Sequence, residues 1–73
     1  TEEEIVELNK DIQRKSKEHI DLQNELVKKI ERAIRENNIT EELLEELERL
    51  LRESEKIVEE IRRITDKIRK DAK

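Results

Sequence analysis

The sequence predicts an all-α protein, a two-helix antiparallel hairpin that assembles into a coiled-coil helical bundle. In residues 5–34 and 43–72, apolar side chains recur every three to four residues, which is the period of one helix face. A short Asn-Asn-Ile-Thr break separates these segments. The chain has no Gly or Pro, and 52% of its 73 residues are charged against 32% hydrophobic. Such a composition with a helical period is typical of coiled coils and long helices.

The first helix is expected over about residues 2–36. Thr1 and Glu4 have the spacing of a capping box, in which each side chain accepts a hydrogen bond from the other residue's backbone N–H. Asn37 and Asn38 follow the helix, and Asn is the residue after Gly that best tolerates the left-handed conformation of a helix C-terminus. The first helix therefore has a signal at each end.

The second helix is expected over about residues 41–72, with Thr40 as its N-terminal cap and two acidic residues in its first turn. Only residues 37–40 are left to join the two helices. A loop this short requires the helices to run antiparallel. Residues 1–73 are therefore expected to form one domain, a single helical hairpin.

Heptad numbering with Val6 and Leu44 at position a places the apolar residues mostly at positions a, d and g. These positions form one face of each helix, so they are expected to be buried. The residues expected in the core of the oligomer are Ile5, Ile12, Ile20, Leu26, Val27, Ile30, Ile34, Leu47, Leu51, Val58, Ile61 and Ile68.

Uncharged polar residues interrupt the same face. A solvated face would carry Lys and Glu, and a plain coiled coil would carry Leu and Ile, so polar residues here predict a buried hydrogen-bond network. With the loop near Asn38, facing residue numbers should sum to about 77, which groups the polar residues into two layers. The first layer comprises Asn9, Gln13, Ser16 and Thr65, and the second comprises His19, Gln23 and Ser54.

The apolar face is wider than a lone hairpin needs. Each helix has three apolar positions per heptad, and the first helix adds Leu8 and Leu22 at position c. A single hairpin would leave an apolar patch larger than monomers expose, so self-association is expected. Because the first helix has the broader arc, we favour a six-helix homotrimer with this helix inside, and a four-helix homodimer second.

These features together resemble de novo designed helical-hairpin homo-oligomers that carry buried hydrogen-bond networks. The resemblance rests on the aliphatic core, the inward Asn, Gln, Ser, Thr and His side chains and the short loop, and it covers Thr1 to Lys73. The Asn-Asn-Ile-Thr connection departs from that class, which often uses Gly or Pro. The resemblance implies a self-assembling structural module whose polar layers penalise wrong registers and copy numbers.

His19 is the one side chain that titrates near neutral pH. One interpretation is a neutral histidine bonded to a Ser or Gln of the polar layer. A second is a pH switch, in which protonation of the buried ring weakens the oligomer as the pH falls. A third, a zinc site made by three copies of His19, lacks a carboxylate that orients the ring. We therefore expect no metal and no cofactor.

Other function classes have weaker support. An enzyme is not expected, because Ser16 and Ser54 have no acid beside them and no glycine turn can form an oxyanion hole. The net charge of −4 with interleaved signs argues against nucleic acid and membrane partners, and no small-molecule partner is expected either. Two alternatives stay open: a coiled-coil adaptor, and an RNA-binding hairpin dimer that would use Arg62, Arg63, Arg69 and Lys70.

The sequence says little about cellular location. It contains no Cys, no visible signal peptide and no apolar run of about 18 residues that could span a membrane. Folding in cytosol-like solution is the expectation, and the compartment is unknown.

Overall fold

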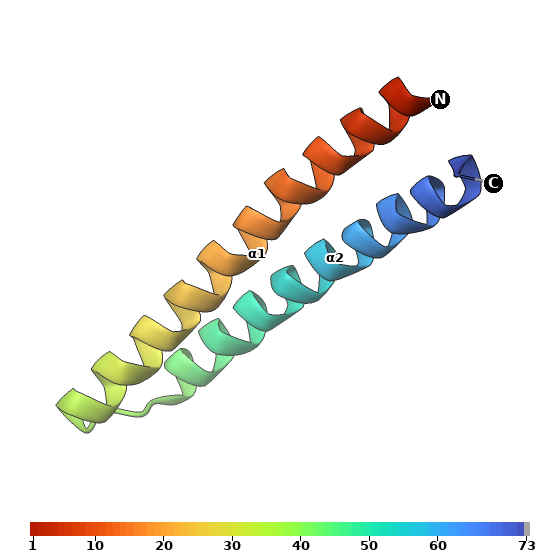
Figure 1. The fold of residues 1–73 in the computed structure, drawn as a ribbon. Helices are drawn as coiled ribbons and strands as arrows, with labels where there is room; N and C mark the ends of the chain where they lie inside the picture. The colour runs from red at the N-terminus through yellow and green to blue at the C-terminus, as the bar shows by residue number, and fades with distance from the viewer. Residues whose placement is uncertain (73) are drawn as a thin grey trace.

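The computed structural model describes residues 1–72, so Lys73 of the predicted domain lies outside the described residues. The chain forms two helices, α1 (Glu2–Glu36) and α2 (Glu41–Asp71), which pack against each other as an antiparallel hairpin (Figure 1). This confirms the predicted all-α, two-helix antiparallel hairpin. The hairpin is a rod of 54 × 15 × 12 Å, with the loop at one end and both termini at the other. We call these the loop end and the open end.

Side-chain caps define the beginning of both helices. The Thr1 hydroxyl accepts a hydrogen bond from the Glu4 backbone N–H, and the Glu4 side chain accepts one from the Thr1 backbone nitrogen, which completes the capping box. The Thr40 hydroxyl accepts a hydrogen bond from the Leu43 N–H at the start of α2. These bonds satisfy backbone donors that have no partner within the helix.

The turn after α1 is a Schellman motif. The Asn37 N–H donates to the Ile34 carbonyl at 3.2 Å, and the Asn38 N–H donates to the Ala33 carbonyl at 3.0 Å. Asn37 has φ 50° and ψ 43°, the left-handed conformation that this motif requires. The chain therefore reverses within four residues, which holds α1 and α2 side by side along their length.

The interface between the two helices, which we call the seam, uses only part of each apolar arc. On α1 it consists of g and c positions with some d positions, and on α2 it consists of g and d positions together with Val58 at position a. Ala33 and Leu50 are buried, and most other seam residues are half-buried. The apolar seam residues are Ile5, Leu8, Ile12, Leu22, Leu26, Ala33, Leu43, Leu47, Leu50, Ile57, Val58, Ile61, Ile64 and Ile68.

Candidate functional site

The middle of the seam holds a polar cluster of three residues, His19, Gln23 and Ser54, which we call the central polar cluster. Ser54 is the most buried of them, with 4% of its surface exposed. The Gln23 Nε2 amide donates a hydrogen bond to Ser54 Oγ at 3.0 Å, and Ser54 Oγ lies 2.7 Å from His19 Nδ1. The structure thus joins the three residues of the second predicted layer within one chain.

The hydrogen-bonding capacity of Ser54 indicates how the cluster is protonated. A serine hydroxyl has one proton to donate and two lone pairs that accept. Since Ser54 already accepts the Gln23 amide proton, it satisfies all three groups when it donates its own proton to His19 Nδ1. In that arrangement the imidazole is neutral and carries its proton on Nε2.

The first predicted layer does not form within the hairpin. Asn9, Gln13 and Thr65 are exposed, and Ser16 is half-buried. The Thr65 hydroxyl donates to the Ile61 carbonyl one turn earlier, at 2.9 Å, so it is satisfied within α2. The layer does not form because Gln13 and Thr65 are at a positions that lie outside the seam, and Asn9 is at an exposed d position. A layer made between chains stays a prediction.

Seven apolar side chains at a and d positions are left exposed by the hairpin, and they lie on one side of it. Ile20 and Ile34, the most exposed of them, keep 56% and 65% of their surface in contact with solvent. The a stripes of two antiparallel helices that meet through their g positions lie on the same side of the pair. We call this surface the a/d face; its apolar residues are Val6, Ile20, Val27, Ile30, Ile34, Leu44 and Leu51.

The predicted oligomer core is therefore divided between two surfaces. Ile20, Val27, Ile30, Ile34 and Leu51 lie on the a/d face. The other seven are half-buried at the seam: Ile5, Ile12, Leu26, Leu47, Val58, Ile61 and Ile68.

A groove connects the central polar cluster with the surface. It has a volume of about 440 Å³ and passes between the cluster and the outer side of α2. A partner that covered this groove would remove the cluster from water and strengthen its hydrogen bonds. The residues that line it are His19, Gln23, Leu51, Ser54, Glu55, Val58, Glu59 and Arg62.

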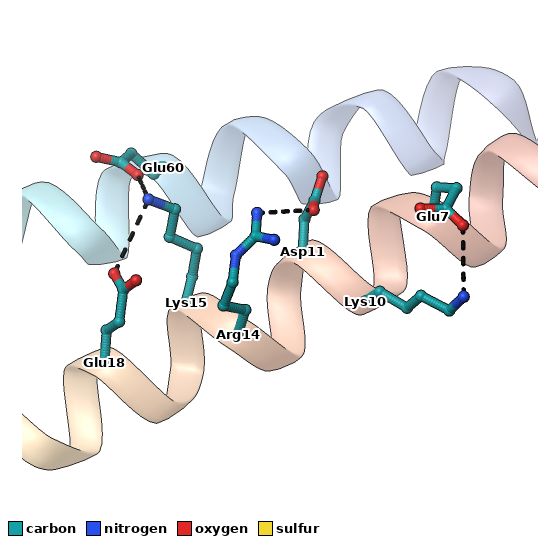
Figure 2. Close-up of polar contacts among 7 residues, drawn as sticks. All are labelled: Glu7, Lys10, Asp11, Arg14, Lys15, Glu18 and Glu60. Atoms are coloured by element: carbon teal, nitrogen blue, oxygen red, sulfur yellow. Dashed lines mark hydrogen bonds and ion pairs between the residues drawn. The ribbon is translucent and has the colours of Figure 1, made fainter.

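The opposite side of the seam carries two ion pairs between the helices. Lys15 Nζ lies 2.5 Å from Glu60 Oε2, and Lys29 Nζ lies 2.7 Å from Glu46 Oε1. Figure 2 shows Lys15 reaching from α1 to Glu60 on α2, with Glu18 nearby. Both pairs join c positions whose numbers sum to 75, close to the expected 77.

These contacts shift the pKa values of three groups. The hydrogen bond from Lys15 is the main cause that lowers the pKa of Glu60, and the same bond raises the pKa of Lys15. The hydrogen bond from Lys29 is the main cause that lowers the pKa of Glu46. In each pair, partial desolvation opposes the shift and the attraction between the charges adds to it.

Apolar periodicity does not single out these four residues, because charged side chains at c positions do not differ in type from those on the solvated face. The sequence does contain a signal for them: the basic c positions of the first helix, Lys15 and Lys29, face acidic c positions of the second helix when facing numbers are paired along the hairpin. The other ion pairs connect neighbouring turns of one helix, such as Arg62 with Glu59 at 3.1 Å and Arg69 with Asp66 at 3.8 Å. These pairs neutralise part of the basic surface that the RNA-binding alternative would use.

Residues 1–72 were compared with the requirements of a membrane span and of a metal site, and they meet neither. Neither helix contains an apolar stretch that could cross a lipid bilayer. Within the same residues, no group of three His, Cys, Asp or Glu side chains is placed to hold a metal ion. Comparisons with protein-family models, with curated proteins and with solved structures found no match to the chain.

Proposed function

We propose that the protein is a self-assembling structural module that completes its hydrophobic core through the a/d face. The observation that carries this proposal is the row of seven large aliphatic side chains left exposed along one side of the hairpin. Isolated exposed aliphatic residues are ordinary, but several of them on the same side of both helices are typical of an interface. The function is therefore mechanical: the hairpin holds copies together in one geometry.

The energetic basis is burial of aliphatic surface. Full burial of one such side chain contributes ~1.5–3 kcal/mol. The seven residues are already 35–63% covered in the hairpin, since their exposed fractions run from 37% to 65%. Docking therefore gains about 1 kcal/mol from each, or about 14 kcal/mol when two chains bury both faces, against an association cost of ~4–15 kcal/mol.

The width of the arc on α1 favours three copies over two. Its seam occupies g and c positions, and its a stripe is free along the whole helix. In a six-helix homotrimer, α1 occupies the inner ring and contacts its own α2 and both other chains, which uses this arc. A four-helix homodimer is the second expectation, with the two a/d faces packed directly on each other.

The open-end polar set, which we define as Asn9, Gln13 and Thr65, gives the assembly its register. These residues are exposed in the hairpin, and a docked copy would bury them. Copies with all loops at one end bring their open-end polar sets to the same level, where the amides can bond one another. A shifted copy would bury them against aliphatic residues without partners.

The central polar cluster gives the assembly a response to acid. With neutral His19, the Ser54 proton has an acceptor at Nδ1. Protonation turns Nδ1 into a donor, and the Ser54 proton then needs another acceptor, so a charged ring should weaken the assembly. The charged groups near the ring are Glu55, Glu59 and Arg62 on α2, and Lys15 one turn earlier on α1.

Substitution of Val27 tests the proposed function. Val27→Glu places a charge in the middle of the exposed stripe. Lys28→Gln changes the net charge by the same amount, but at an exposed b position outside the stripe. Native mass spectrometry should show multimers for the unmodified chain and for Lys28→Gln, and mostly single chains for Val27→Glu. An unmodified chain that stays single at micromolar concentration would refute the proposal.

A further inference from the structure

Charged residues line the a/d face along both helices, and their signs are segregated. The e positions lie about 40° around the helix from the a positions, so they border the stripe on each helix. All of them are exposed. We call them the rim, which comprises Glu3, Lys10, Lys17, Asn24 and Glu31 on α1 and Glu41, Glu48, Glu55, Arg62 and Arg69 on α2.

The rim is acidic toward the loop end and basic toward the open end. Glu31 on α1 and Glu41, Glu48 and Glu55 on α2 lie in the half nearer the loop. Toward the open end both helices change to the opposite sign, and Glu3 in the first turn is the exception. The basic rim residues are Lys10, Lys17, Arg62 and Arg69.

The surface inside the rim is graded in polarity along the same axis. Its aliphatic side chains are concentrated from the middle to the loop end, where Ile34 and Leu44 are exposed. The open-end polar set occupies the other half, with Val6 beyond it. A partner must therefore present aliphatic groups at the loop end and hydrogen-bonding groups at the open end.

An identical copy docked in the opposite direction has attractive charges at the rim but unfavourable contacts inside it. Acidic loop ends would then meet basic open ends. However, Asn9 and Gln13 on α1 would lie about level with Ile30 and Val27 of the second copy, and their amides would be buried without partners. A buried unsatisfied amide costs more than an exposed ion pair returns, so this arrangement is disfavoured.

An identical copy docked with its loop at the same end has matched polar groups inside the rim but like charges facing each other at the rim. The open-end polar sets then meet at one level. However, α1 of one copy then lies beside α2 of the other. Facing residue numbers sum to 75, as they do for Lys15 and Glu60, so Lys10 of one copy is level with Thr65 of the other and lies between its Arg62 and Arg69. At the loop end, Glu31 would likewise meet the acidic residues of α2. Like charges held against each other in this way disfavour the pairing.

We infer that the a/d face prefers a non-identical partner over a copy of itself. The partner is a second two-helix hairpin that docks with its loop at the same end, places polar side chains level with Gln13 and Thr65, and carries a rim that is basic at its loop end and acidic at its open end. This inference rests on the proposed function, since it requires the a/d face to be a docking surface. The rim then decides which hairpin occupies it.

A rim-inverted chain supplies such a partner for a direct test. It keeps every a, d and g residue and the net charge, and it leaves Glu41 and Arg69 in place because they suit the dipole at the two ends of α2. The matched control inverts six outward charges instead: Glu18→Lys, Glu25→Lys, Arg32→Glu, Arg49→Glu, Glu53→Lys and Arg63→Glu. The rim-inverted chain carries Lys10→Glu, Lys17→Glu, Glu31→Lys, Glu48→Lys, Glu55→Lys and Arg62→Glu.

The measurement is native mass spectrometry after the isotope-labelled unmodified chain is unfolded and refolded with an equal amount of each variant. The ratio of mixed to uniform assemblies with the rim-inverted chain should exceed its statistical value by about tenfold, because several like-charge contacts become attractive at once. Mixed assemblies with the control variant should match the statistical share. Statistical mixing with both variants would overturn the inference, and so would sorting of the unmodified chain away from the rim-inverted chain.

A second measurement needs no variant and covers the case in which the rim-inverted chain does not fold. If identical copies assemble with like-charged rims together, salt screens a repulsion. The dissociation constant of the unmodified chain should then fall when NaCl is raised from about 0.05 M to about 0.5 M. A rise would indicate attractive rims between identical copies and would overturn the inference. Single chains in every mixture and at both salt concentrations would refute the docking surface itself, and with it the proposed function.

Discussion

Gln23 and Ser54, 31 residues apart in the sequence, are joined by a hydrogen bond of 3.0 Å across the seam. The same Ser54 hydroxyl contacts His19 Nδ1 at 2.7 Å. Ser54 is therefore the single point through which two polar side chains of α1 are tied to α2. Because Ser54 is buried and the seam around it is otherwise aliphatic, this cluster distinguishes one register of the two helices from the others.

Ser54→Ala should lower the free energy of unfolding by ~1–3 kcal/mol, because the Gln23 amide and His19 Nδ1 would lose their partner at a half-buried site. Urea unfolding followed by circular dichroism at 222 nm measures the change at a fixed protein concentration. Ser16→Ala is the matched control, since Ser16 is half-buried on α1 and makes no side-chain hydrogen bond within residues 1–72. Equal effects of the two substitutions would contradict the role given to Ser54.

His19→Asn should remove the response to mild acid while keeping an acceptor for the Ser54 hydroxyl. The unmodified chain should lose multimers as neutral solution is made mildly acidic, because a protonated Nδ1 no longer accepts the Ser54 proton. The variant should keep them over that range. Native mass spectrometry along a pH series provides the comparison, and parallel curves for the two proteins would remove His19 from the explanation.

Glu60→Gln should change the stability of the protein at low pH. The pKa of Glu60 lies below its usual 4.5, so its pair with Lys15 contributes stability above that pH and the contribution is lost as the pH falls through the lowered value. The pKa of Lys15 lies above 10.5, so its contribution is full below that pH and is lost as the pH rises through the raised value.

The variant should therefore show a shallower loss of stability below about pH 5 and a shallower loss above about pH 10. Thermal unfolding over a pH series measures both limbs. Glu53→Gln, an exposed carboxylate on the same helix, serves as the control and should leave both limbs in place. An unchanged alkaline limb in Glu60→Gln would show that the pair with Lys15 does not govern the titration.

Gln13→Leu combined with Gln23→Leu should keep or raise the thermal stability of the assembly, because aliphatic side chains replace one amide on the surface that docking would bury and one that is half-buried at the seam. The same change should broaden the distribution of copy numbers, since fewer polar groups penalise the wrong arrangement. Native mass spectrometry and thermal unfolding together test both parts. The single variants separate the exposed Gln13 from Gln23, which bonds Ser54. A complete loss of assembly would mean that the amides hold the structure together.

Asn37→Ala should lower the free energy of unfolding by about 1 kcal/mol, because a side chain with Cβ and no local hydrogen bond is strained at φ 50°. Asn37→Gly should be tolerated for the converse reason. Asn38→Ala is the control, since Asn37 is the one residue with positive φ within residues 1–72. Chemical unfolding of the three variants ranks them, and equal stability of Asn37→Ala and Asn37→Gly would contradict the strain argument.

The helix ends could be predicted from the sequence because their causes are local. The expected bounds, about 2–36 and about 41–72, differ by at most one residue from α1 and α2. A capping box, an Asn in the left-handed conformation and a Thr cap each act within five residues of the chain, so one sequence contains all that they require. The level at which Gln23 meets Ser54 followed from the short loop for the same reason.

Only the tertiary structure decided how each helix is rotated about its own axis. Periodicity indicates an apolar arc on each helix, but an arc wider than one contact leaves several rotations open. In the folded chain the c and g positions of α1 face α2, where Lys15 and Lys29 find their acidic partners. The a positions, with Gln13 among them, are left outside. The rotation of each helix about its axis depends on the packing and ion pairs of both helices together, so it cannot be predicted from the sequence pattern of one helix.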